Sequence, residues 1–203
     1  MTAGRRPRRV RRRRVIAAAA LGVVALGVAW GIVHKTMPAW YARLWYPLRY
    51  EDAIRVEARQ NGLDPALVAG VIYRESKFSA SSRSRRGAVG LMQVLPATAR
   101  FIHSQATGPR PMPARLGDPR VNIEYGTWYL RYLMSKYGSE PLALAAYNGG
   151  ETNLREWLAR AHARGRQLRL PDDIPFPETR AFVRSVGHAR DIYRRAYGSQ
   201  LGG

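Results

Sequence analysis

Glu75 is the side chain in this sequence best placed for acid–base chemistry. It follows Val71 by four positions and Ile72 by three, spacings that put the three side chains on one face of a helix. A carboxyl group on an apolar face loses contact with water, which raises its pKa. A carboxylic acid that stays protonated near neutral pH can donate a proton to a glycosidic oxygen. The alternative from spacing alone is a solvated glutamate at a helix end, paired with Arg74 or Lys77.

Other kinds of reactive centre find little support. The chain has no cysteine, which excludes disulfides, thiolate metal sites, cysteine nucleophiles and cysteine lipidation. Gly87 and Gly90 are not followed by the lysine that a phosphate-binding loop needs. We therefore expect neither a metal nor a cofactor. The four histidines are scattered without the spacing of metal ligands, at His34, His103, His162 and His188.

Helices must position Glu75, because helical spacing of apolar residues dominates from Tyr50 onward. Asp64-Pro65 is a typical helix start, with a capping side chain before a proline. Stretches rich in Gly, Pro, Ser or Arg predict loops at 76–89, 105–119 and 164–177. We see no alternating strand and no internal repeat, so the expected fold is compact and all-α. The expected helices span about 50–60, 65–75, 90–104, 121–137, 142–148, 152–163 and 178–197.

Five short strings surround and follow Glu75 in a fixed order. In this order and spacing they resemble the catalytic domain of the soluble lytic transglycosylases, lysozyme-like enzymes that act on peptidoglycan. The resemblance covers about residues 50–197 and implies an all-α, lysozyme-like helical domain of the goose-type lysozyme and transglycosylase kind. The strings are ES at 75–76, GAVGLMQ at 87–93, DPRVNIEYGTWYL at 118–130, AAYNGG at 145–150 and IPFPETR at 174–180.

The resemblance implies a role for five residues. Glu75 matches the catalytic glutamate of the family. Gln93 belongs to a motif that lines the groove, so it is a candidate saccharide contact. Tyr147 and Asn148 match a motif whose tyrosine reaches the catalytic carboxylate. Ser84 aligns with a loop serine that contacts the substrate near the reacting sugar.

Each of these positions also has an ordinary structural interpretation. Gln93 fits a solvated helix residue, and Tyr147 fits a packed aromatic with a satisfied hydroxyl. Asn148 fits a cap before Gly149-Gly150, and Ser84 is a common loop residue. Leu91 and Met92 are expected in the core. Glu178 and Arg180 fit a charged pair at a helix start, or a support of the groove floor. The chain also departs from the family pattern at Phe182, where many members have tyrosine.

The resemblance further implies a mechanism with a single carboxylate, because no second acid with a matching motif is evident near Glu75. Glycosidases ordinarily use two carboxyl groups. In enzymes of this family the N-acetyl group of the substrate assists bond cleavage, and the C6 hydroxyl of the muramoyl sugar closes a 1,6-anhydro ring. The expected function is therefore non-hydrolytic cleavage of the MurNAc-GlcNAc β-1,4 bond. The alternatives are a goose-type lysozyme-like muramidase and a non-catalytic wall-binding scaffold.

The N-terminal region has the pattern of a membrane anchor. Eight arginines within residues 5–14 precede an uncharged run at 15–33, which as a helix is about 28 Å long. That length is close to a bilayer's hydrocarbon thickness of about 30 Å. The positive-inside rule predicts a cytoplasmic basic tail at 1–14 and export of the chain beyond the run. We expect a juxtamembrane linker at 34–49 and a catalytic domain at 50–200.

The net charge of +20 is concentrated at the same end. Residues 1–49 hold eleven Arg or Lys and no acid, whereas residues 50–203 hold 23 basic and 14 acidic residues, about +9. The alternative to an anchor is a cleaved signal peptide, since Ala25, Gly27 and Ala29 suit a peptidase site. An arginine arm for nucleic acid is disfavoured, because a spanning run directly follows it. The expected partners are thus glycan strands and the cell membrane, with no nucleic acid.

Overall fold

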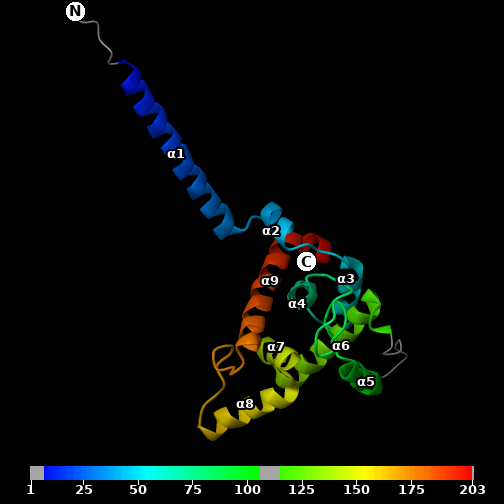
Figure 1. Ribbon diagram of the computed structural model, residues 1–203. Helices are drawn as coiled ribbons and strands as arrows, with labels where there is room; N and C mark the ends of the chain where they lie inside the picture. Colours follow the sequence, from blue (N-terminus) through cyan, green and yellow to red (C-terminus); the bar gives the residue numbers. More distant parts are fainter. Residues whose placement is uncertain (1–6, 106–114, 203) are drawn as a thin grey trace, which may run out of the picture.

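The computed structural model describes residues 7–105 and 115–202. Helix α1 (Pro7–Thr36) extends away from the other helices, which gather into one body (Figure 1). The regular elements of the described chain are helical, as predicted from the sequence. The helices of the body are α2 (Ala39–Trp45), α3 (Glu51–Gln60), α4 (Pro65–Ser76), α5 (Pro96–Gln105), α6 (Pro119–Tyr137), α7 (Glu140–Gly149), α8 (Glu151–Ala163) and α9 (Pro177–Leu201).

Helix α4 lies at the centre of this body, and its residues from Ala66 to Ile72 are all buried. It begins as predicted: the Asp64 carboxylate accepts a hydrogen bond of 2.8 Å from the Ala66 amide, and Pro65 occupies the first turn. Gly70 lets α4 approach α9 closely, because a Cβ at this position would lie 3.0 Å from the Arg190 amide nitrogen. The most extensive helix contact of the fold therefore depends on a residue without a side chain.

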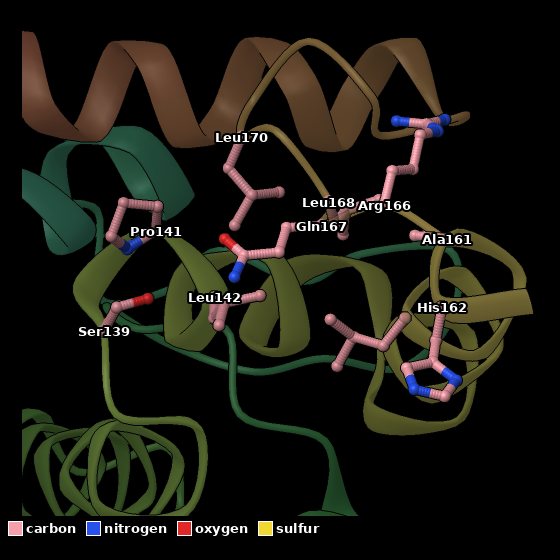
Figure 2. Close-up of a pocket in the computed structure, with 10 residues that line it drawn as sticks. Ser139, Pro141, Leu142, Ala161, His162, Arg166, Gln167, Leu168 and Leu170 are labelled. Carbon is pink, nitrogen blue, oxygen red and sulfur yellow. The ribbon is translucent and has the colours of Figure 1, made fainter. Parts of the chain in front are cut away.

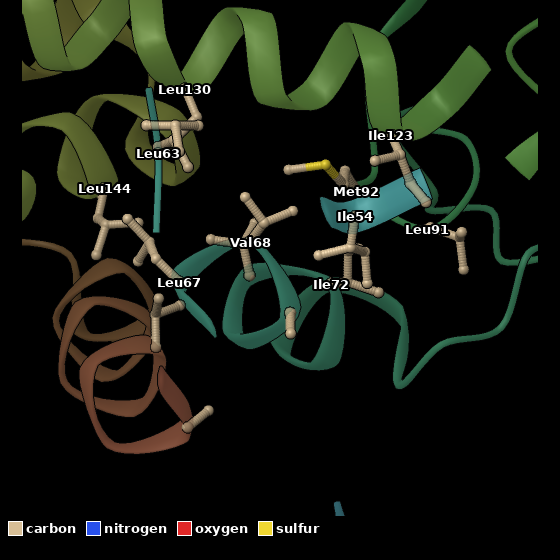
Figure 3. Packing of buried hydrophobic residues seen from close by; sticks show 14 of the residues in the cluster. Ile54, Leu63, Leu67, Val68, Ile72, Leu91, Met92, Ile123, Leu130 and Leu144 are labelled. Atoms are coloured by element: carbon tan, nitrogen blue, oxygen red, sulfur yellow. The ribbon is translucent and has the colours of Figure 1, made fainter. Parts of the chain in front are cut away.

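The core continues from α4 to α6 and to the loop before α5. Figure 3 shows Met92 from that loop between Ile123 and the α4 side chains, with Val68 facing Leu130 across the core. All of these side chains are completely buried. Close packing of this kind holds the end of α4 and the loop in a fixed relation.

The predicted helix at 90–104 is wrong in its first half, since α5 begins only at Pro96. Gly90 and Gln93 have φ angles of 81° and 48°, in the left-handed region that ends helices. Val89 instead forms isolated antiparallel bridges with Arg83 and with Val94. Residues 90–95 are thus a compact turn that packs on α6.

The predicted linker at 34–49 contains a short helix, α2, for which no helix was predicted. The Arg43 guanidinium donates hydrogen bonds of 3.1 and 2.8 Å to the Ala196 carbonyl on α9. The hydroxyls of Tyr193 and Tyr197 donate to the carbonyls of Pro47 and Tyr46. The sequence period of such a short helix is weak, and the partners lie about 150 residues away.

Helix α1 contains a stretch, Val15–Val33, that is long and apolar enough to cross a membrane by length and composition. A signal sequence has the same properties, so the helix alone does not separate the two expectations. The part of the predicted basic tail at 1–6 lies outside the described residues, as do the arginine side chains up to 14 and the residues 106–114 of the predicted loop at 105–119.

The contact between α4 and α9 generates a first prediction. Gly70→Ala should destabilise the protein by about 1–3 kcal/mol, because the added methyl group meets α9 backbone that cannot move aside. Gly187→Ala is the matched control on α9, since a Cβ there meets nothing within 4 Å. The control should gain about 0.5–1 kcal/mol from helix propensity. Urea unfolding of both variants measures the difference, and equal midpoints would contradict the packing argument.

Candidate active site

Glu75 lies in the last turn of α4, with its side chain half-buried. Burial is the main cause that raises the pKa of its carboxyl group from 4.5 to about 8. The neighbouring Arg74 opposes this shift, and the negative charge of Glu178 on α9 adds to it. Glu75 is therefore a carboxylic acid that remains largely protonated at neutral pH.

Tyr147 on α7 belongs to the same site. Burial raises its pKa well above the ordinary value of 10, and the charge of Glu75 is the second cause. Its hydroxyl donates a hydrogen bond of 2.8 Å to the Met92 carbonyl. The family resemblance led us to expect this tyrosine to reach the carboxylate directly. In the structure its hydroxyl proton is directed to the loop, and the charge of Glu75 contributes to its raised pKa.

A buried asparagine that the sequence analysis did not single out holds this loop in place. The Asn122 side chain on α6 accepts a hydrogen bond of 2.7 Å from the Met92 amide. It donates to the carbonyls of Val89 at 2.7 Å and Leu116 at 3.0 Å. All polar atoms of this completely buried amide group are therefore used. In the sequence, the only sign of this role is that Asn122 is a polar residue between the apolar residues Val121 and Ile123 at the start of α6.

Two glycines allow the loop to approach α6. A Cβ at Gly90 would lie 2.4 Å from the Asn122 amide nitrogen, and one at Gly126 would lie 2.4 Å from the Met92 sulfur. Neither distance is possible for real atoms. Gly90 in the motif at 87–93 and Gly126 in the motif at 118–130 are thus explained by one contact between the two segments.

Gln93 and Ser84 both stabilise the loop through their own polar groups. The Gln93 amide nitrogen donates to the carbonyls of Gly90 at 2.8 Å and Ser82 at 3.2 Å. The Ser84 hydroxyl accepts a hydrogen bond of 3.0 Å from the Ala88 amide, in a part of the loop exposed to solvent. The helical setting considered for Gln93 is wrong, because the residue lies in a turn.

Asn148 joins α7 to α9, because its side-chain oxygen accepts a hydrogen bond of 2.8 Å from the Thr179 hydroxyl. Both residues line a cavity of about 340 Å³, which Glu178 and the loop residue Arg86 also line. Glu178 is exposed and acts electrostatically on Glu75. The sequence showed no second acid with a matching motif near Glu75, and it did not predict this effect of Glu178.

The interpretation of Glu178 and Arg180 as a charged pair is wrong within the described residues. The Arg180 guanidinium donates instead to the Ile174 carbonyl at 2.8 Å, which holds the segment before α9. Phe182, where the family pattern has tyrosine, is buried in the core.

A row of aromatic rings continues from Tyr147 along α6. The ring centroids of Tyr147 and Tyr129 are 5.6 Å apart, and Tyr132 stacks on Tyr129 at 6.1 Å and on Trp128 at 5.7 Å. Tyr129 and Tyr132 line a cavity of about 430 Å³ that also includes Lys136. Aromatic faces beside polar groups suit the binding of amphipathic molecules such as sugars.

A cavity of about 520 Å³ lies elsewhere (Figure 2). Leu142 on α7 and Leu170 in the loop after α8 point into the same space, with His162 at its edge. None of the five predicted site residues lines it. Among the described residues no group of three or more His, Asp or Glu is arranged to hold a metal ion, and the His34 side chain lies outside that description.

Comparison with known proteins places this site in a family. Residues 52–170 match the family model of the transglycosylase SLT domain. The soluble lytic murein transglycosylase of Salmonella typhimurium is 33% identical over 157 residues, which are 76% of this chain and 24% of that protein. A transglycosylase of the Enterobacteria phage PRD1 is 38% identical over 113 residues, which are 56% of this chain and 39% of the phage protein.

Solved structures agree with this result. The lytic transglycosylase Slt of Pseudomonas aeruginosa, solved as an inactive mutant with glutamine in place of a glutamate, matches with a TM-score of 0.69 and 31% identity over 79% of this chain. The 70 kDa soluble lytic transglycosylase of Escherichia coli matches with a TM-score of 0.69 and 30% identity. The matches cover 26% of each of those chains. This chain thus spans about a quarter of the length of these relatives, and the expected fold class is confirmed.

The buried amide of Asn122 generates a prediction. Asn122→Ala removes three hydrogen bonds and leaves the buried Met92 amide without its partner, so it should cost about 2–4 kcal/mol. Asn153→Ala is the control, because it removes one hydrogen bond to the Gly149 carbonyl on α7. It should cost about 1 kcal/mol. Chemical denaturation measures both, and an equal cost would show that Asn122 does not organise the loop.

The raised pKa of Glu75 predicts a dependence of stability on pH. The folded state holds this proton between pH 4.5 and about 8, where the unfolded chain has lost it, so stability falls as pH rises through that range. Glu75→Gln cannot ionise and should therefore melt at a higher temperature than the wild type at pH 8.5. The difference should vanish near pH 4.5. Calorimetry beside the exposed-site control Glu156→Gln tests this, and a constant difference would contradict the assigned pKa shift.

Proposed function

Because the chain belongs to the transglycosylase SLT domain family, we propose that it cleaves peptidoglycan glycan strands at the β-1,4 bond between MurNAc and GlcNAc. The observation that carries the proposal is a single protonated acid, Glu75, half-buried beside Tyr147 and a row of aromatic rings. The Pseudomonas aeruginosa relative supports it, since that enzyme is described as inactive with glutamine in place of one glutamate.

In the proposed reaction Glu75 acts first as an acid and then as a base. Its proton goes to the glycosidic oxygen, and the bond from that oxygen to the anomeric carbon of the muramoyl sugar breaks. The N-acetyl oxygen of the same sugar stabilises the anomeric carbon as the bond breaks. The Glu75 carboxylate then takes the proton of the C6 hydroxyl, whose oxygen bonds to the anomeric carbon. The product has a 1,6-anhydromuramoyl end, and no water is consumed.

The surrounding residues keep this cycle possible. The Tyr147 hydroxyl donates its proton to the Met92 carbonyl. It therefore does not donate a hydrogen bond to Glu75, which would stabilise the carboxylate and lower its pKa. Gln93 has its amide nitrogen committed to the turn, and its side-chain oxygen is the atom we assign to a saccharide hydroxyl. Asn148 and Ser84 are assigned to the two sides of the sugar-binding groove.

Glu178 favours one second candidate, a muramidase that uses water. Its exposed carboxylate acts on Glu75 and lines the adjacent cavity, where it could hold a water molecule as a general base. Product mass distinguishes the two reactions, since hydrolysis adds one water to each cleavage.

We also propose that the stretch Val15–Val33 anchors the chain in the cell membrane, with the catalytic domain outside the cytoplasm. The exposed apolar surface of this helix supports the proposal, because such a surface requires lipid or another cover. The basic residues before it set the orientation.

The catalytic role of Glu75 predicts the outcome of one assay. Glu75→Gln should lower the release of anhydromuropeptides from purified murein by at least about 10²-fold, because glutamine cannot transfer the proton. The wild-type rate should itself fall as pH rises through about 8, where Glu75 loses its proton. Mass spectrometry of the products measures both the yield and the presence of the anhydro ring.

Glu178→Gln is the matched control for this assay, because it removes the neighbouring acid and leaves Glu75 in place. Under the transglycosylase proposal it keeps the anhydro product. Products heavier by one water in the wild type, lost in Glu178→Gln, would establish the hydrolase instead. Wild-type rates in Glu75→Gln would contradict both.

A further inference from the structure

Helix α2 presents an apolar face to solvent although it is packed against the catalytic body. Trp40, Leu44 and Trp45 are 62%, 71% and 60% exposed. On the opposite face Tyr41 and Ala42 are buried. A seven-residue helix has little stability of its own and depends on its contacts. An exposed apolar surface with two tryptophans indicates that a partner covers this face.

The body holds α2 firmly, so this face has a fixed direction. Arg43 binds the Ala196 carbonyl and lies over the Tyr197 ring at 5.2 Å from its centroid. Behind α2 the rings of Tyr46 and Tyr73 pack 4.5 Å apart. The Tyr73 hydroxyl donates to the Trp45 carbonyl at 3.2 Å. Because Tyr73 and Glu75 are two residues apart on α4, the face of α2 is rigidly related to the active site.

The same face is continuous with the apolar surface of α1. The two helices are separated only by Met37 and Pro38, and the Trp30 and Tyr41 rings meet edge to face at 6.0 Å. Figure 1 shows α2 at the base of α1, beside the end of α9. An apolar space of about 510 Å³ lies between them, lined by residues that include Leu26, Trp30, Trp40 and Leu44.

Composition indicates what covers the face. Tryptophan and tyrosine are the residues that concentrate at the boundary between lipid tails and headgroups. Residues 34–49 also carry Lys35, Arg43 and Arg49 and no acid, which suits anionic headgroups. The span that immediately precedes this region would bring a bilayer to that level.

We infer that Trp40, Leu44 and Trp45 insert into the outer boundary of the bilayer, so that α2 docks the catalytic domain on the lipid surface. This inference rests on the proposed anchoring by Val15–Val33 and is independent of the reaction. The domain then has one orientation relative to the membrane. Its groove then lies at one fixed height above the lipid, whereas the groove of a freely hinged domain would move through many heights.

The cysteine-free sequence allows a direct test on the full chain. The variants Leu21→Cys in the span, Leu44→Cys on α2 and Arg160→Cys on α8 each carry one nitroxide label on an exposed position. They are reconstituted in vesicles of phosphatidylethanolamine and phosphatidylglycerol. Collision rates with oxygen, which partitions into lipid, and with a polar nickel chelate, which stays in water, report the depth of each label.

The label at 44 should have an oxygen-to-nickel collision ratio several-fold above that at 160 and closer to that at 21. A ratio at 44 equal to that at 160, with the label at 21 in lipid, would overturn the docking and leave the anchor intact. Aqueous ratios at both 21 and 44 would overturn the anchoring as well. Protection of position 44 from both reagents that increases with protein density would point to a second copy of the chain, and would also overturn the inference.

Discussion

The side-chain amide of Asn122 is the interaction on which the arrangement of the candidate active site depends. It is completely buried and binds the backbone on both sides of residues 90 and 91, so the turn has only one way to lie on α6. That position directs the Met92 carbonyl at the Tyr147 hydroxyl. The same turn puts the Met92 side chain against Gly126 in the core. Backbone geometry, core packing and the surroundings of Glu75 are thus set together, because a buried polar group tolerates only an arrangement that satisfies all its hydrogen bonds.

The raised pKa of Glu75 shows how stability and chemistry oppose each other in this fold. An ionised carboxylate at the end of a buried helix is unfavourable, and the neighbouring charge of Glu178 makes it more so. The rest of α4 offsets this cost, because its residues from Ala66 to Ile72 are buried without a polar side chain among them. The acid thus lies at the end of a helix whose buried residues belong to the core. Catalytic groups are commonly placed in such costly surroundings, which is the physical reason for their perturbed pKa values.

Sequence reasoning could find what local chemistry determines. Asp64-Pro65 and Asp118-Pro119 begin helices because capping and proline geometry act within a few residues. It failed at residues 90–95, where left-handed turns at Gly90 and Gln93 override an apolar period, and at α2, whose partners on α9 are distant in sequence. The influence of Glu178 on Glu75 arises from the packing of α9 on α4, and a spacing rule cannot show it. The roles of Ser84, Gln93, Tyr147 and Asn148 toward a sugar came from resemblance, and remain proposals that the geometry accommodates.

The two-residue connection between α1 and α2 leaves the helical body very little freedom to move relative to α1. A long flexible linker would let a tethered domain reach glycan strands at many distances from the membrane. Because Met37 and Pro38 are the whole connection, the distance that the domain can reach from the membrane is set by the size of the domain itself. On the proposed anchoring, the glycan within reach is the layer that faces the bilayer. Strands farther out are spared by geometry alone, without any inhibitor.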